Sequence, residues 1–199
     1  VAVRGTSQFV SNNFSEEARQ MLKESMEKGQ VDKKRGNKLP PKDFEKGYEG
    51  SKHLSVDGWC GIPCIAFKAA MVRAGSLVGV EMTKAKQCIE ILADGVATHG
   101  SGLVRITSGE PERFDAYVPN SNGSPDIRAR ARFPAGWEAT VTIRYDADFL
   151  SASSVINLLA RAGWSVGVGA GRPFSTMSVG QGWGTFEVVT DDEKKEAAE

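Results

Sequence analysis

The sequence has few of the residues from which disulfide frameworks and metal sites are built. Its 199 residues include three cysteines and two histidines. An odd number of cysteines makes no disulfide framework, and the chain lacks an apolar run of membrane length, so we expect a cytoplasmic protein with no membrane partner. The pair Cys60 and Cys64 also lacks a histidine at zinc-ligand spacing. We therefore expect buried thiols, no metal and no cofactor.

The formal net charge is zero, because 25 acidic residues balance 25 basic ones. The balance is uneven along the chain, since residues 187–199 carry six acids and two lysines. Residues 1–186 hold the other 23 basic and 19 acidic side chains. A mildly basic body with an acidic tail is compatible with a polyanionic partner. Residues 191–199 are expected to be a disordered tail.

A standard nucleotide-binding loop is also absent, although residues 163–186 are rich in glycine. In a dinucleotide fingerprint the glycines follow a strand and open a helix, whereas here the helix expected at 151–162 comes first. No Walker lysine follows, because Arg172 leads into Pro173. Retaining so much glycine predicts positive φ angles, or close approach of the backbone to something else. The glycines of this loop are Gly167, Gly169, Gly171, Gly180, Gly182 and Gly184.

Apolar periodicity and breaker residues predict a single α+β domain over residues 1–190. Helices are expected at 16–28, 63–74 and 151–162, the first with an apolar stripe of Ala18, Met21, Leu22 and Met26. Lysine, glycine and proline dominate residues 29–52, which we expect to be an exposed arm. Strands are expected at 1–4, 86–93, 103–107, 113–118, 126–133 and 137–145, with a short last strand opening at Phe186.

The strands expected at 126–133 and 137–145 are predicted to pair as a hairpin around residues 133–137. Strand alternation places Arg128, Arg130 and Arg132 together on one exposed face. This pairing sets Arg132 opposite Glu138 and the other two arginines opposite Thr140 and Thr142. The row has two interpretations. It is a solvated face that protects solubility and a sheet edge, or it is a phosphate-tracking face, since its spacing of about 6.6 to 7 Å resembles the rise of an extended single strand.

The order of the elements is that of a ferredoxin-like (RRM-like) βαββαβ core with an inserted β-hairpin, a C-terminal glycine-rich loop and an exposed N-terminal arm. Two motifs add to this. The segment GIPCIAFKAAMVRA at 61–74 resembles the first helix of the RAMP superfamily, the backbone and processing proteins of CRISPR systems, with Lys68 and Arg73 on matching positions. The glycine loop around Arg172 resembles that superfamily's C-terminal glycine-rich loop. The chain also resembles small phage-encoded proteins of this size, and the resemblance covers residues 52–189.

The resemblance implies a protein whose copies assemble side by side along a single strand. RAMP backbone subunits do so with the glycine loop and first helix near the phosphates. This implies Lys68, Arg73 and Arg172 as backbone contacts, and the arm at 32–52 as a thumb or a contact to the next subunit. The chain is much shorter than typical CRISPR backbone subunits, which favours a phage role in strand binding or annealing.

The leading hypothesis is a non-enzymatic single-stranded nucleic-acid-binding protein that oligomerises along ssDNA or ssRNA. One alternative is a structural or interaction protein, such as a phage assembly or host-inhibitor factor, without nucleic acid. A second is a metal-independent ribonuclease, in which His53 would activate a ribose hydroxyl. The binding candidates are Lys52, His53, Lys68, Arg73, Arg128, Arg130, Arg132 and Arg172, with the loop backbone at Gly167, Gly169, Gly171, Gly180 and Gly182.

Overall fold

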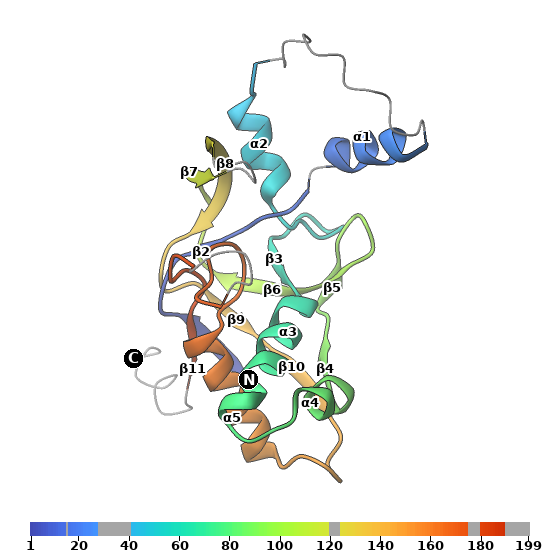
Figure 1. Cartoon of the computed structure of the whole chain (residues 1–199), viewed down its shortest axis with the longest axis vertical. Coiled ribbons are helices and arrows are strands. Elements are labelled where there is room, and N and C mark those ends of the chain that lie inside the picture. The colour runs from blue at the N-terminus through green and yellow to red at the C-terminus, as the bar shows by residue number, and fades with distance from the viewer. Residues whose placement is uncertain (15, 28–40, 120–123, 175–179, 190–199) are drawn as a thin grey trace.

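The chain folds as an α+β protein with antiparallel sheets, as a computed structural model shows (Figure 1). The structure describes residues 1–14, 16–27, 41–119, 124–174 and 180–189. Its helices are α1 (Glu16–Glu27), α2 (Phe44–Ser51), α3 (Cys64–Ala74), α4 (Met82–Cys88) and α5 (Ala152–Ser165), with a 3-10 turn η1 (Gly75–Leu77). The strands are β1 (Ala2–Gly5), β2 (Phe9–Val10), β3 (Gly61–Pro63), β4 (Ile89–Leu92), β5 (Gly95–Val96), β6 (Gly102–Ser108), β7 (Glu112–Pro119), β8 (Pro125–Phe133), β9 (Glu138–Thr140), β10 (Thr142–Tyr145) and β11 (Phe186–Val188). Within these ranges no helix is long and apolar enough to cross a membrane.

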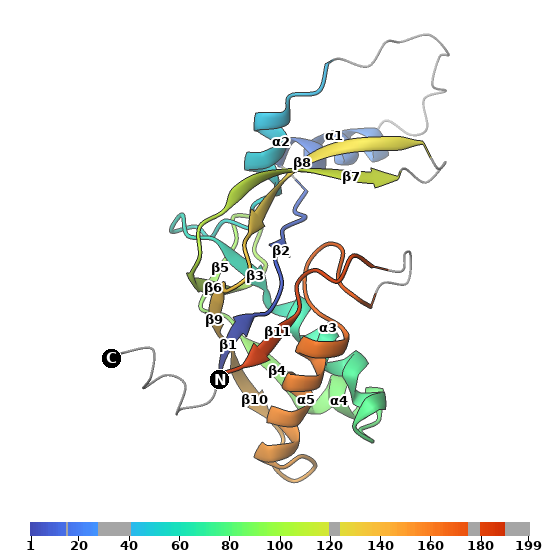
Figure 2. The same cartoon turned by 90° about the vertical axis from the view of Figure 1, so that its left-hand side faces the viewer.

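The main sheet has the strand order β11-β1-β9-β6-β3, with β5 also paired to β6, and each neighbouring pair is antiparallel. A separate ladder joins β10 to β4. Figure 2 shows α3, α4 and α5 together on one face of the main sheet. The predicted helices at 63–74 and 151–162 are therefore confirmed as the two helices that cover this sheet.

The core lies between the main sheet and the helices α3 and α5. Phe67 of α3 meets Phe186 of β11 edge to face, with ring centroids 5.5 Å apart. Trp137, which precedes β9, lies 6.3 Å from the same phenylalanine ring. Leu158 and Leu159 of α5 are fully buried beside them. This aromatic and aliphatic cluster joins the first and last strands to both helices, so it holds the main sheet together.

A second sheet, in the order β2-β8-β7, rises from the first and carries α2 on one face (Figure 1). α2 is tied to β8 by Ser51, whose hydroxyl accepts a 2.7 Å hydrogen bond from the Ala131 amide and donates to the Tyr48 carbonyl. Asp43 caps the helix by accepting from the Lys46 amide. Within the arm expected at 29–52, residues 44–51 form a helix that packs on a sheet, and its residues are exposed or half-buried except Ser51. Residues 29–40 of that arm lie outside the described part.

The predicted hairpin of 126–133 with 137–145 is wrong. β8 pairs with β7 over residues 125–132, so that Arg132 lies opposite Glu112, Arg130 opposite Phe114 and Arg128 opposite Ala116. Glu138 instead bonds Arg4 of β1. The reason is that Phe133 and Trp137, at the two ends of the turn, are both buried in the core, which sends the chain from one sheet into the other.

Three further expectations are corrected by packing. The strand expected at 86–93 begins only at Ile89, because Ala85 is buried on a helix, α4, that packs against α3. The strand expected at 137–145 is divided at Val141, whose amide bonds the Val1 carbonyl. The helix expected at 16–28 forms as α1, but Met21, Leu22 and Met26 of its apolar stripe are exposed.

The glycine loop after α5 is folded onto its own chain. All six of its glycines have positive φ, as the sequence predicts. The Gly184 amide donates to the Gln8 carbonyl, and a Cβ at Gly184 would overlap the Val168 carbonyl oxygen. A Cβ at Gly169 would lie 2.7 Å from the carbonyl oxygen of Val10 in β2. The group that approaches these glycines is therefore backbone of this protein.

Substituting Gly184 by alanine is expected to destabilise the fold more than the same change at Gly182. Both residues have positive φ, which costs an alanine about 1 kcal/mol. At Gly182 nothing lies within 4 Å of the added Cβ, whereas at Gly184 the overlap adds about 1–3 kcal/mol. Urea denaturation of both variants measures the difference. Equal losses in the free energy of unfolding would show that the loop is not docked as described.

Candidate functional site

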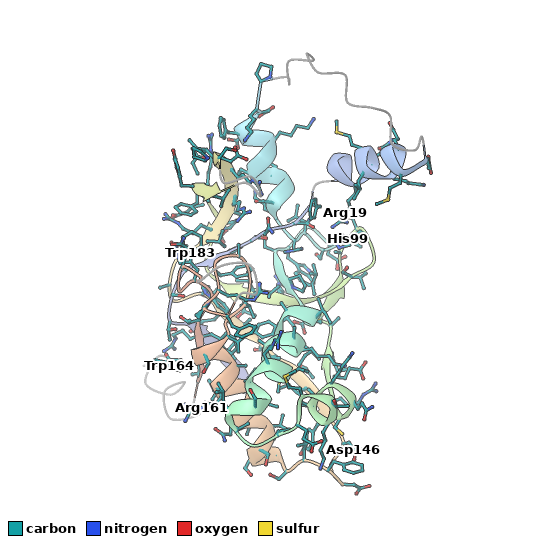
Figure 3. The ribbon with its side chains drawn as sticks, in the orientation of Figure 1. Arg19, His99, Asp146, Arg161, Trp164 and Trp183 are labelled. Atoms are coloured by element: carbon teal, nitrogen blue, oxygen red, sulfur yellow. The ribbon has the colours of Figure 1, made fainter. Side chains whose placement is uncertain are left out.

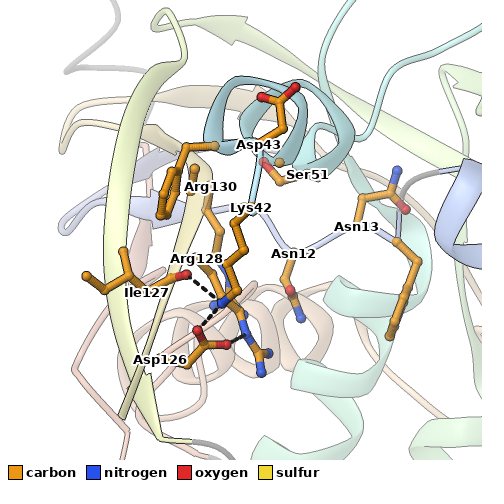
Figure 4. Close-up of a pocket in the computed structure, with 13 residues that line it drawn as sticks. Asn12, Asn13, Lys42, Asp43, Ser51, Asp126, Ile127, Arg128 and Arg130 are labelled. Atoms are coloured by element: carbon orange, nitrogen blue, oxygen red, sulfur yellow. Dashed lines mark hydrogen bonds and ion pairs between the residues drawn. The ribbon is translucent and has the colours of Figure 1, made fainter. Parts of the chain in front are cut away.

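A cleft of about 440 Å³ lies between α2, the β8 strand and the segment that follows β2 (Figure 4). β2 pairs with β8 at two positions, Phe9 with Phe133 and Val10 with Arg132, and the Ser11 amide then bonds the Ala131 carbonyl. Beyond Ser11 the chain leaves β8, and no strand of the described part pairs with this edge over residues 126–130. This open edge of β8 forms one wall of the cleft.

Two cations of the cleft hold a shared carboxylate (Figure 4). Lys42, just before α2, donates from Nζ to Asp126 Oδ1 and to the Ile127 carbonyl oxygen at 3.3 Å. Arg128 donates from Nε to the other oxygen of Asp126, at 3.2 Å. The hydrogen bond from Lys42, and then that from Arg128, holds the pKa of Asp126 below its usual range. The pair of cations is thus partly neutralised within the protein.

The third cation, Arg130, lines the same cleft but is placed differently. Its exposed fraction is only 8%. Among the described residues, no hydrogen-bond acceptor or carboxylate contacts its guanidinium group, and burial followed by the charge of Arg128 lowers its pKa. A buried cation without a partner is costly, because protein groups replace little of its lost hydration. Arg130 is therefore the group of the cleft that a bound anion would stabilise most.

The mouth of the cleft carries an exposed aromatic ring and two amide side chains. Phe14, the last described residue before α1, is 66% exposed. Asn13 is held in place, since its Nδ2 donates to the Lys52 carbonyl at 2.9 Å and its Oδ1 accepts from Arg19 at 2.7 Å. Asn12 is exposed beside it. The cleft therefore offers positive charge at its wall and a flat apolar ring at its edge.

The predicted arginine row is present on one face of β8, but it is not a uniform exposed row. Ala129, Ala131 and Phe133 are buried on the opposite face, which confirms the alternation. Arg132 pairs with Glu112 at 2.6 Å and lies over the Phe114 ring, outside the cleft lining. The prediction that Arg130 is exposed is wrong, because neighbouring elements cover this part of β8. Arg128 and Arg130 are the two members that share the cleft.

The candidates implied by the RAMP resemblance lie elsewhere. Lys68 of α3 is half-buried and lines a different cavity, of about 370 Å³, with Cys64 and Glu90. The guanidinium of Arg73 lies 4.6 Å from the centre of the Phe174 ring in the glycine loop. Arg172 donates to the Gly169 carbonyl at 3.1 Å. The structure thus brings Arg73 and Arg172 to the same loop, apart from Lys68, and none of the three lines the cleft between α2 and β8.

Lys52 and His53 are held by internal contacts. Lys52 bonds Glu49 at 2.7 Å and lies over the Tyr48 ring. Nδ1 of His53 is buried and has no hydrogen-bond partner in the part of the chain that the structure describes. Burial, with smaller contributions from His99 and Arg19, lowers the pKa of His53 to about 4 (Figure 3). This histidine is therefore neutral at pH 7.

Several residues of the cleft were not predicted from the sequence, among them Asn12, Asn13, Phe14, Lys42 and Asp126. One usable signal is the position of Asp126, two residues before Arg128 on the same face of a predicted strand. Another is Phe14, a lone aromatic in a polar segment. Nothing in the local sequence indicates that Lys42 contacts β8, because that contact depends on where α2 packs.

Comparison with protein-family models, with curated proteins and with solved structures gives no match for this chain. Within the described residues, no group of three or more histidine, cysteine and acidic side chains is placed to hold a metal ion. The functional assignment therefore depends on the cleft itself.

The neutral His53 is expected to make folding stability depend on pH. Its pKa is lowered from 6.5 to about 4, so the unfolded chain binds the extra proton between these values. The contribution is fully present above pH 6.5 and is lost as the pH falls toward 4, by up to about 1.4 kcal/mol per pH unit. Denaturant unfolding of wild type and of His53→Gln from pH 4 to 8 measures it. We expect a shallower pH dependence in the variant; identical profiles would contradict the buried neutral state.

Proposed function

We propose that this protein is a non-enzymatic single-stranded nucleic-acid-binding protein, and that the cleft between α2 and β8 holds a phosphate of the strand. The observation that supports this most is Arg130, a buried arginine that lines the cleft and has no partner in the described part of the chain. A guanidinium group donates two parallel hydrogen bonds to a phosphate, which would replace the hydration lost on burial.

The surroundings of the cleft favour a polyanion over a small isolated anion. Residues 28–40, which connect α1 to the segment before α2, contain five basic residues and one acidic residue. The two described ends of this basic segment, after α1 and before α2, lie at the end of the molecule that also carries β7 and β8 (Figure 1). Basic side chains that neutralise phosphates release counterions when a nucleic acid binds, so affinity is expected to fall steeply with salt.

A single strand is favoured over a duplex because of Phe14. Its ring is 66% exposed at the cleft mouth, where an unpaired base can stack on it. Stacking on an aromatic ring contributes about 1–3 kcal/mol per base and tolerates any sequence. In a duplex both faces of each base are already stacked. The volume of about 440 Å³ falls within the range of pockets that hold small ligands, which is suitable for one nucleotide unit.

The fold belongs to the same proposal. The strand order β11-β1-β9-β6, with α3 between β1 and β6 in the chain and α5 between β9 and β11, is the order expected of a ferredoxin-like βαββαβ core. In this assignment β2, α1, α2, β7 and β8 are insertions that build the cleft. The resemblance to the RAMP superfamily, a phage role in strand binding or annealing in the cytoplasm, and assembly of several copies along one strand complete the proposal.

Fluorescence anisotropy with labelled oligo(dT) and oligo(U) tests the proposal, with a duplex of the same length for comparison. We expect Arg130→Met to bind the single strands about 10-fold more weakly, since it loses a charge-assisted contact of about 1.5 kcal/mol. The same variant is expected to unfold at a higher temperature, because it removes an uncompensated buried charge. Phe14→Ala, at an exposed position, is expected to weaken binding without changing stability.

Arg144→Met is the matched control, because Arg144 pairs with Glu90 on the β10–β4 ladder at the other end of the molecule. It removes the same charge and is expected to bind like wild type. Equal affinities of Arg130→Met and wild type would remove the cleft from the mechanism. No binding by wild type at low salt would contradict the nucleic-acid proposal and favour an interaction protein instead.

A further inference from the structure

The carboxylate of Asp126 occupies the position in the cleft where its cations converge. It accepts hydrogen bonds from Lys42 and from Arg128, one on each oxygen (Figure 4). Its side chain is only 17% exposed, although the salt bridge to Lys42 lies at the surface. A carboxylate and a phosphate use the same kind of donors in the same bidentate geometry. Asp126 therefore holds in this structure the two contacts that a phosphate would seek.

We infer that Asp126 is an internal competitor for the phosphate of the bound strand, which must displace it from Lys42 and Arg128. This inference rests on the proposed function. The cleft then has two kinds of cation. Arg130 has no partner among the described residues, whereas Lys42 and Arg128 exchange their contacts to Asp126 for contacts to the phosphate when Asp126 is displaced.

The other carboxylate of the cleft, Asp43, caps a helix. Asp43 accepts a hydrogen bond from the Lys46 amide and caps α2, so its charge is offset by the positive end of that helix. It lies on α2, whereas Asp126 extends from β8 on the strand face that carries both arginines. Among the described residues, Asp126 is the one of these two that contacts the cleft cations, so the competitor is one side chain that a substitution can remove.

A competitor of this kind selects for a polymer over a small anion. Free phosphate gains the contact to Arg130, but it must exchange one anion for another at Lys42 and Arg128, which yields little net affinity. A nucleic-acid strand adds base stacking on Phe14, which lines the cleft, so it can displace the carboxylate. Asp126 would thus keep the cleft closed to the phosphate of metabolites and buffer while it admits a strand.

The test compares Asp126→Asn with Asp115→Asn in the full chain. Asparagine has the shape of aspartate but no charge. Asp115 is a suitable control because it lies on the neighbouring strand β7, is exposed and pairs with Arg113, so its loss changes the net charge equally without touching the cleft. Binding of labelled oligo(dT) is measured by anisotropy, and binding of inorganic phosphate by calorimetry.

We expect Asp126→Asn to bind oligo(dT) about 10-fold more tightly than wild type, which corresponds to one charge-assisted contact regained. It is also expected to bind inorganic phosphate measurably, unlike wild type, and to lose that binding again in the double variant Asp126→Asn with Arg130→Met. Asp115→Asn is expected to remain within about twofold of wild type, because an exposed charge outside the cleft is screened.

Equal affinities of Asp126→Asn and Asp115→Asn for oligo(dT), with wild-type binding that still depends on Arg130, would overturn the competitor role alone. Phosphate binding by wild type as strong as that by Asp126→Asn would overturn it as well. If wild type binds no oligonucleotide and Asp126→Asn binds none either, the proposed function fails, and the inference fails with it. Thermal unfolding of each variant confirms that the binding data refer to folded protein.

Discussion

The pairing of β8 with β7 is the constraint on which the candidate site depends. It joins eight residue pairs, from Glu112 with Arg132 to Pro119 with Pro125, and it leaves the other edge of β8 open beyond Ser11. α2 covers one face of this ribbon, through the hydrogen bond of Ser51 to the Ala131 amide. The opposite face carries the arginines. One strand thereby presents cations to a cleft whose other walls come from α2 and the segment after β2.

The electrostatics of the cleft follow from this arrangement. Three cations and two carboxylates line it, and one carboxylate serves as a helix cap. The other engages Lys42 and Arg128, which leaves Arg130 buried without a protein partner among the described residues. A fold selected for stability alone would gain from an apolar residue at this position. A loss of stability of this kind is expected at a ligand-binding residue. Burial of the guanidinium destabilises the unliganded fold, and it strengthens the interaction of the same group with a bound anion.

Local elements were predictable from the sequence, and contacts between distant residues were not. Apolar spacing located α3 and α5 and the alternation of β8, because these properties depend on residues a few positions apart. The partner of β8 was wrong because strand pairing is settled by core packing, here of Phe133 and Trp137. The glycine loop shows the same limit. Positive φ was predictable from composition, but the approach of Val168 and Val10 to Gly184 and Gly169 depends on how the loop folds back.

Part of the site could be found in the sequence for the same reason. Arg128 and Arg130 were expected to act together, and the cleft brings them together, while Arg132 is engaged by Glu112. Lys42 and Phe14 come from segments far from β8 in the chain, and nothing in their local sequence indicates that they meet it. In the proposed function, their convergence with the arginines provides one wall for a phosphate and one ring for a base.

The most direct test of the cleft as the proposed nucleic-acid site is photocrosslinking of the protein to a single strand that contains 5-iodouracil, followed by mass spectrometry of the crosslinked peptides. A base stacked on an aromatic ring crosslinks to it efficiently. The main crosslinked residue is expected to be Phe14, with weaker crosslinking to Asn12 or Asn13. Crosslinks concentrated instead on exposed Trp164 of α5, or on Phe174 and Trp183 of the glycine loop, would contradict the cleft as the binding site.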